Sequence, residues 1–127
     1  MSVPENLRYS ESHEWVRDEG DGIVTVGITD FAQEKMTELV FVELPDADTE
    51  IAAGEELAVV ESVKSASDIY APVAGVVVES NAALEDDPTL VNNAPYTDGW
   101  LFKIRISDAA AVEAMMDAAA YGIHISE

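Results

Sequence analysis

The stretch VVESVKSASDIYAPVAGVVVESN (59–81) says most about how this chain folds. It overlaps two runs rich in β-branched residues, 55–62 and 67–80, which are punctuated by glycine and proline. Such runs are typical of strands, and glycine and proline mark where strands turn or end. Between the two runs lies the short polar sequence SVKSAS. The pattern predicts a hairpin with Lys64 at or near its tip.

Lys64 is unusual in a chain that avoids positive charge, because the only other lysines are Lys35 and Lys103. Serine and alanine neighbours leave its amine sterically open, and a tight turn presents it away from the rest of the domain. These properties suit a lysine that another enzyme modifies and that then carries a long tethered group. From these residues alone, however, an ordinary solvated lysine is the more frequent outcome.

The flanking segments predict further strands and turns. Residues 12–28 predict a hairpin with extended runs at 13–17 and 22–28, in which Gly20 and Gly22 supply the positive φ values of the turn. LVFVEL (39–44) predicts a strand that is buried on both sides at its start. WLFKIRI (100–106) alternates as a strand with one solvated face does.

Helices are expected at the margins of this β-rich core. One begins at Thr29 or Asp30, and a helical turn is expected at 82–86. Ser107 or Asp108 is expected to cap a C-terminal helix, DAAAVEAMMDAAA. With 127 residues, the chain is expected to form a single domain, residues 1–127.

The charge balance restricts the partners. The chain has 26 acidic and six basic residues, for a net charge of −20, and such a surface repels both nucleic acid and anionic membranes. We prefer a salt-loving microbial source as the explanation, because high salt screens the self-repulsion of a strongly charged chain. The N-terminal sequence MSVPENLRYS has no secretory or transit pattern, so a cytoplasmic location is expected.

Common catalytic and metal-binding patterns are missing from the sequence. There are no cysteines, which excludes disulfides and thiolate nucleophiles. The two histidines, His13 and His124, lack the spacing of metal ligands, and we interpret His13 as a structural strand residue. No phosphate-binding glycine motif occurs.

Residues 59–81 resemble the lipoylation region of glycine cleavage H proteins, with the acceptor lysine at Lys64. Other stretches match the same family in the same order: SHEWV (12–16), VGITDFAQE (26–34), LVFVELP (39–45), LVNNAPYTDGWLFKI (90–104) and MMDAAAYGIHI (115–125). VGITDFAQ and the combination of Pro95, Tyr96, Gly99 and Trp100 are not shared with other lipoyl carriers. The last residues, YGIHISE, are less typical of the family, and we expect them to matter little.

The resemblance implies a mainly β, lipoyl-domain-like fold, the barrel-sandwich hybrid, with short flanking helices and a C-terminal helix. It implies that the protein is a non-catalytic carrier with lipoic acid joined by an amide bond to Lys64. The lipoyl arm would carry an aminomethyl group from glycine decarboxylase, a pyridoxal phosphate enzyme, to a tetrahydrofolate-dependent aminomethyltransferase. Dihydrolipoamide dehydrogenase would then reoxidise the arm. A lipoate ligase or lipoyltransferase would attach it, and the carrier is expected to be a monomer.

Four further residues are expected to act around the lipoyl arm. Glu14, Ser12 and Asp68 are candidates to contact the loaded arm, because a cationic amine in a cleft is stabilised by carboxylate or hydroxyl groups. Glu61, three residues before Lys64, is a candidate for recognition by the lipoylating enzyme.

Rival interpretations remain at this point. A lipoyl domain of a 2-oxo acid dehydrogenase has an acceptor turn closer to DKA than to VKS, and a biotinyl carrier places its lysine between methionines. Here Val63 and Ser65 flank Lys64. An H-like protein that mainly donates lipoate to other complexes is a third alternative. An enzyme is the remotest one, because no set of base and nucleophile stands out.

Overall fold

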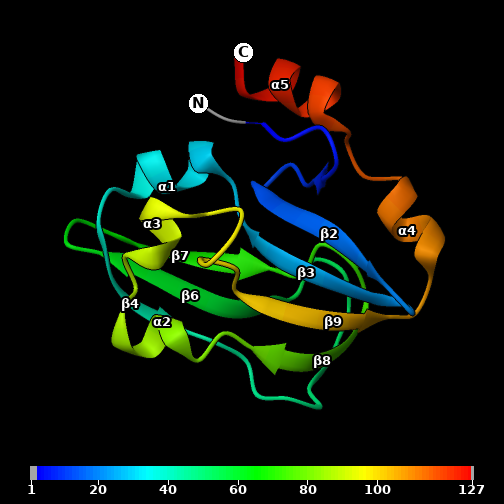
Figure 1. The fold of residues 1–127 in the computed structure, drawn as a ribbon, viewed down its shortest axis with the longest axis horizontal. Helices are drawn as coiled ribbons and strands as arrows, with labels where there is room; N and C mark the ends of the chain where they lie inside the picture. The colour runs from blue at the N-terminus through cyan, green and yellow to red at the C-terminus, as the bar shows by residue number, and fades with distance from the viewer. Residues whose placement is uncertain (1–2, 127) are drawn as a thin grey trace.

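The computed structural model describes residues 3–126, which form two antiparallel sheets and five short helices (Figure 1). The larger sheet has the order β1 (Arg8–Tyr9), β2 (Glu14–Gly20), β3 (Ile23–Ile28), β9 (Phe102–Ile106), β8 (Gly75–Ser80) and β5 (Glu50–Ile51). The smaller sheet has the order β4 (Leu39–Glu43), β6 (Glu56–Ser62) and β7 (Ala66–Tyr70). The helices are α1 (Asp30–Met36), α2 (Ala83–Asp86), α3 (Leu90–Asn93), α4 (Ala109–Glu113) and α5 (Ala118–Ser126).

This arrangement confirms the expected mainly β fold with short helices and a C-terminal helix. None of the helices within residues 3–126 combines the length and the apolarity needed to span a bilayer. The single domain 1–127 stays a prediction, and its first two residues and its last residue lie outside the described part.

The two sheets enclose a core because their strands alternate between buried and solvated side chains. In β6, Ala58, Val60 and Ser62 are buried, whereas Val59 and Glu61 are only partly covered. Alternation with a period of two directs one face of a sheet inward, and both sheets contribute residues to one apolar cluster. A second cluster, built around Tyr9, Trp15, Tyr121 and Leu7, joins the N-terminal strands to α5.

Short-range signals predicted the turn and the first helix correctly. Gly20 and Gly22 have φ values of +90° and +77°, as expected for the β2–β3 turn. Thr29 is the N-cap of α1, since its side chain accepts a hydrogen bond from the N–H of Ala32. Asp108 caps α4 by accepting from the N–H of Ala110.

One strand prediction was correct and another was wrong. The strand-like run 67–80 divides at its proline and glycine, since β7 ends at Tyr70 and the chain crosses to the other sheet before β8 begins at Gly75. Residues 39–44 are not buried on both sides: Val40 and Phe41 are 50% and 48% exposed. A register shift between Leu39 and Phe41 interrupts the pairing of β4 with β6, and the alternation of buried positions is broken there.

The C-terminal helix is interrupted, which was not expected. Instead of one helix over 108–120, α4 and α5 are separated at Met116, whose N–H and C=O exchange hydrogen bonds of 3.1 and 2.8 Å with the backbone of Tyr9. Asp117 then caps α5 by accepting from the N–H of Ala120. A long-range backbone pairing therefore overrides the local helical preference.

The close approach of β8 to β9 yields a prediction for Gly75. A Cβ atom at Gly75 would lie 2.2 Å from the backbone oxygen of Arg105, so Gly75→Ala must move a strand. We expect it to lower the free energy of unfolding by about 2 kcal/mol. Gly122→Ala meets no atom within 4 Å and should instead stabilise α5 by up to about 1 kcal/mol. Urea unfolding measures both, and equal effects of the two variants would contradict this account.

Candidate functional site

Lys64 lies in the turn between β6 and β7, residues 62–65, called here the Lys64 turn. This turn projects at the left edge of the molecule in Figure 1. The N–H of Ser62 donates to the C=O of Ser65 at 2.8 Å, and the Ser62 hydroxyl accepts from the N–H groups of Lys64 and Ser65 at 3.4 and 3.3 Å. The serine side chain thus fixes the turn from within, while Val63 at its tip is 80% exposed.

Lys64 differs from the other two lysines in its contacts. The ammonium of Lys35 lies 5.3 Å from the ring centre of Phe31, and that of Lys103 lies 5.1 Å from the ring of Trp100. Within the described residues, the Lys64 amine has no hydrogen bond, ion pair or aromatic contact of this kind. Its side chain is exposed, so the amine is accessible to another protein.

A cleft of about 180 Å³ borders the strand that follows the Lys64 turn. This β7 cleft is mostly apolar and includes a few polar side chains. Its lining residues are Ser12, His13, Ile28, Phe31, Ala32, Lys35, Met36, Val60, Ser67, Asp68 and Ile69. The structure therefore brings together Ser12 and Asp68, two of the residues that were expected to contact a loaded arm.

Glu14 lies one hydrogen bond behind this lining. The whole residue is 1% exposed, and its Oε1 accepts hydrogen bonds of 2.6 Å from the hydroxyls of Ser10 and Ser12. Its Oε2 has no hydrogen-bond partner in residues 3–126. Burial raises the pKa of Glu14 above its ordinary value, and the two serine hydroxyls, with the backbone N–H groups of Tyr70 and Glu14 itself, partly oppose that shift. A buried carboxylate with an unused oxygen is suited to receive a donor or a cation.

His13 forms part of the wall of the β7 cleft, and Tyr121, which is not in the lining, holds His13 from behind. The Tyr121 hydroxyl lies 2.8 Å from Nδ1 of His13 and 2.7 Å from the hydroxyl of Thr29. The His13 ring packs on Phe31 with ring centres 4.8 Å apart. Burial, together with nearby His124, lowers the pKa of His13, and burial raises the pKa of Tyr121 to about 12.

Two expectations about this wall were wrong. His13 is not a strand residue: it precedes β2 with a φ of +74°, a conformation uncommon for a residue with a side chain. The final segment YGIHISE was expected to matter little, yet Tyr121 is completely buried and anchors the wall. Only the aromatic residue in a C-terminal helical segment hinted at this from the sequence.

Glu61 lies near Lys64 but away from the core. It pairs across the sheet with Phe41 on β4 and with Ala66 on β7, and its side chain is half-buried. The sheet therefore holds Glu61 on the face opposite to the buried side chains of Val60 and Ser62.

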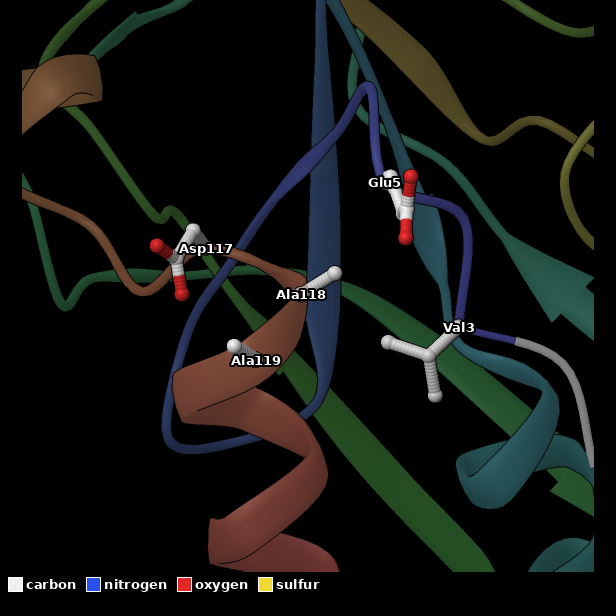
Figure 2. A pocket seen from close by; sticks show the side chains of 5 residues that line it. All are labelled: Val3, Glu5, Asp117, Ala118 and Ala119. Carbon is white, nitrogen blue, oxygen red and sulfur yellow. The ribbon is translucent and has the colours of Figure 1, made fainter.

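A larger hollow of about 390 Å³ lies elsewhere, between the N-terminal segment and the start of α5. Figure 2 shows its lining, with Val3 and Glu5 facing Asp117, Ala118 and Ala119. The carboxylate of Asp117 is already used to cap α5, and the hollow lies away from the turn that joins β6 and β7 (Figure 1). Among residues 3–126 no cluster of side chains has the composition of a metal site.

Comparison with known proteins agrees with this geometry. The family model described as "Glycine cleavage H-protein" matches residues 7–127. The glycine cleavage system H protein of Enterobacter sp. (strain 638) is 60% identical over 120 residues, which cover 94% of this chain and 93% of the relative. That of Chromohalobacter salexigens is 52% identical over 124 residues, covering 98% and 95%.

A solved structure gives the same result for the fold. The crystal structure of a glycine cleavage system H protein from Mycobacterium marinum superposes with a TM-score of 0.89 at 37% identity. It covers 98% of this chain and 100% of the other, so the barrel-sandwich, lipoyl-domain-like fold is confirmed. The chain therefore belongs to the glycine cleavage H-protein family.

Proposed function

We propose that this chain is the lipoyl carrier of a glycine cleavage system, with lipoate attached to the Nζ of Lys64. The observation that carries the proposal is the placement of Lys64: an exposed amine without a partner among the described residues, on a turn fixed by Ser62 and directly before a cleft-lining strand. Membership of the family supports the same assignment.

The residues present fit such a group. Lipoate, when bound, supplies a dithiolane that can accept an aminomethyl group and be reduced. The Lys64 turn would hold the attachment point away from the sheets, so that the arm reaches both other active sites and its own cleft. The apolar lining of the β7 cleft, including Ile28 and Met36, would cover the arm's hydrocarbon part and limit the access of water.

The polar groups at the cleft would hold the charged end of a loaded arm. Ser12 and Asp68 lie in the lining, and Glu14 is hydrogen-bonded to Ser12 with one carboxylate oxygen unused. Charge-assisted hydrogen bonds from an arm amine to these oxygens would favour the ionised form of Glu14 and retain the amine.

The carrier would work with several enzymes. Its partners would be the pyridoxal phosphate-dependent glycine decarboxylase, the tetrahydrofolate-dependent aminomethyltransferase, dihydrolipoamide dehydrogenase and a lipoate ligase or lipoyltransferase. The chain would be a non-catalytic, monomeric, single-domain protein in the cytoplasm of a salt-loving prokaryote. The net charge of −20 supports this setting, because salt screens repulsion within such a surface.

Lipoylation of Lys64 can be tested directly. Intact-mass and peptide mass spectrometry of protein from its native source should locate a lipoyl adduct on Lys64. Lys64→Arg should abolish the adduct, and the matched control Lys103→Arg should retain it. An unmodified Lys64 in cells that lipoylate other proteins would overturn the carrier proposal, whereas a biotinyl adduct would assign the chain to a carboxylase.

Glu14 is expected to help retain the aminomethyl group. Glu14→Gln should speed its loss from the loaded protein by about tenfold, because a neutral amide cannot form a charge-assisted bond with the amine. Release of formaldehyde and ammonia measures the decay. Glu11→Gln, an exposed neighbour, is the control and should decay at the wild-type rate. Equal decay of the Glu14 variant and wild type would remove Glu14 from the site.

Glu61 is expected to take part in recognition by the lipoylating enzyme. If this carboxylate helps the lipoylating enzyme to recognise the Lys64 turn, Glu61→Ala should be lipoylated several-fold more slowly, with a higher KM and little change in kcat. The rate of lipoyl attachment to the purified unmodified protein measures this. A normal rate would show that recognition does not involve Glu61.

A further inference from the structure

We infer that the solvent-facing side of β4 and β6, beside the Lys64 turn, is the docking surface for the enzyme that attaches lipoate. This surface, called the outer face below, consists of Phe41 and Glu43 on β4 and Leu57, Val59 and Glu61 on β6. The inference rests on the proposed function, since it takes Lys64 as the attachment point.

Strand register gathers these side chains on one side of the sheet. Phe41 lies opposite Glu61, and Glu43 lies opposite Val59, so each apolar side chain is beside a carboxylate. The alternate residues Val42, Ala58 and Val60 point into the core, which leaves the outer face to solvent. Its most prominent apolar group is Phe41, at 48% exposure.

Two hollows make the outer face more than a scatter of exposed residues. One, of about 370 Å³, lies between β4 and α2 and is lined by Phe41, Glu43, Glu85 and neighbouring residues. The other, of about 230 Å³, is lined by Glu43, Glu56, Leu57, Ala58 and Val59. Glu43 borders both hollows. The hollow beside α2 is the more apolar, and the other is shallow and mainly polar, so a partner can place an apolar side chain in the first and polar groups over the second.

Charge specifies the partner's chemistry. Strands β4, β6 and β7 carry four carboxylates, Glu43, Glu56, Glu61 and Asp68, and Lys64 is the single basic residue in these strands and their connecting turn. A complementary partner therefore presents an apolar centre surrounded by arginine or lysine side chains. Exposed Val63 extends the apolar part of the surface to the turn itself.

The length of a lysine side chain selects the attaching enzyme among the partners. Lipoate and ATP first form an acyl adenylate and release pyrophosphate. Nζ of Lys64, as the neutral amine, then attacks the carboxyl carbon, so that an amide bond forms, the C–O bond to AMP breaks and Nζ loses one proton. A four-carbon stem must place Nζ inside the partner's active site, so the partner must touch the sheet around the turn. Enzymes that act on the far end of the finished arm have no such need.

The test measures steady-state lipoylation of the full-length unmodified chain by a purified bacterial lipoate–protein ligase with lipoate and ATP. Glu43→Lys should lower kcat/KM about tenfold at low salt, through KM, and added salt should narrow the difference. Phe41→Ser should lower kcat/KM about fivefold at every salt concentration, because the lost contact is apolar.

Matched controls remove general effects of charge and exposure. Glu50→Lys makes the same charge change on exposed β5 of the other sheet, and Ile123→Ser removes an exposed apolar side chain from α5. The kcat/KM of both variants should stay within about twofold of wild type, because substitutions outside an interface have little effect on binding. Carboxyl footprinting of wild type should also show that bound ligase protects Glu43 and leaves Glu50 reactive, which tests the surface without any variant.

Each contrary outcome has a separate meaning. Equal kinetics for Glu43→Lys and Glu50→Lys, or no protection of Glu43, overturns the docking surface while leaving Lys64 as the acceptor. Normal lipoylation with impaired aminomethyl transfer from purified glycine decarboxylase assigns the outer face to a later enzyme, and a dimer dissolved by Glu43→Lys assigns it to a second copy of the chain. Failure of the ligase to modify wild type instead counts against the proposed function.

Discussion

The buried hydroxyl of Tyr121 holds together the parts of the molecule on which the β7 cleft depends. It joins α5 to His13, which precedes β2, and to Thr29, which caps α1. The ring of Tyr121 stacks on Tyr9 with centres 4.6 Å apart, so the same residue also fixes β1. Because buried hydroxyls are costly without partners, this pair of hydrogen bonds selects one arrangement of the three segments.

Local sequence signals predicted the elements whose structure is decided locally. The glycines of the β2–β3 turn, the cap at Thr29 and the turn that presents Lys64 all follow from neighbouring residues. The break at Met116 and the burial of Tyr121 depend on partners about a hundred residues away, which no local pattern contains. Ser12 and Asp68 were expected near the arm because the family resemblance implied a cleft and a cationic amine there needs hydroxyl or carboxylate partners.

The site combines two opposite electrostatic environments. On the inner side, Glu14 is withdrawn from water and retains one unsatisfied oxygen, which is expensive for folding and useful only if a donor arrives. On the outer side, Glu43 is exposed and Glu61 is half-buried, so their charges cost little folding free energy. They can attract a charged partner before contact is made. Lys64 lies on an exposed turn, outside both the buried environment of Glu14 and the outer face of the sheet.

The backbone pairing of Tyr9 with Met116 has a consequence for how the protein is made. Contacts between distant residues require closure of a long loop, so they form late in folding. The Lys64 hairpin involves only nearby residues and can form while the ribosome is still adding the C-terminal segment. The attachment turn is therefore expected to form before the C-terminal segment docks on β1, and pulsed hydrogen exchange would register this order as late protection of the Tyr9 and Met116 amides.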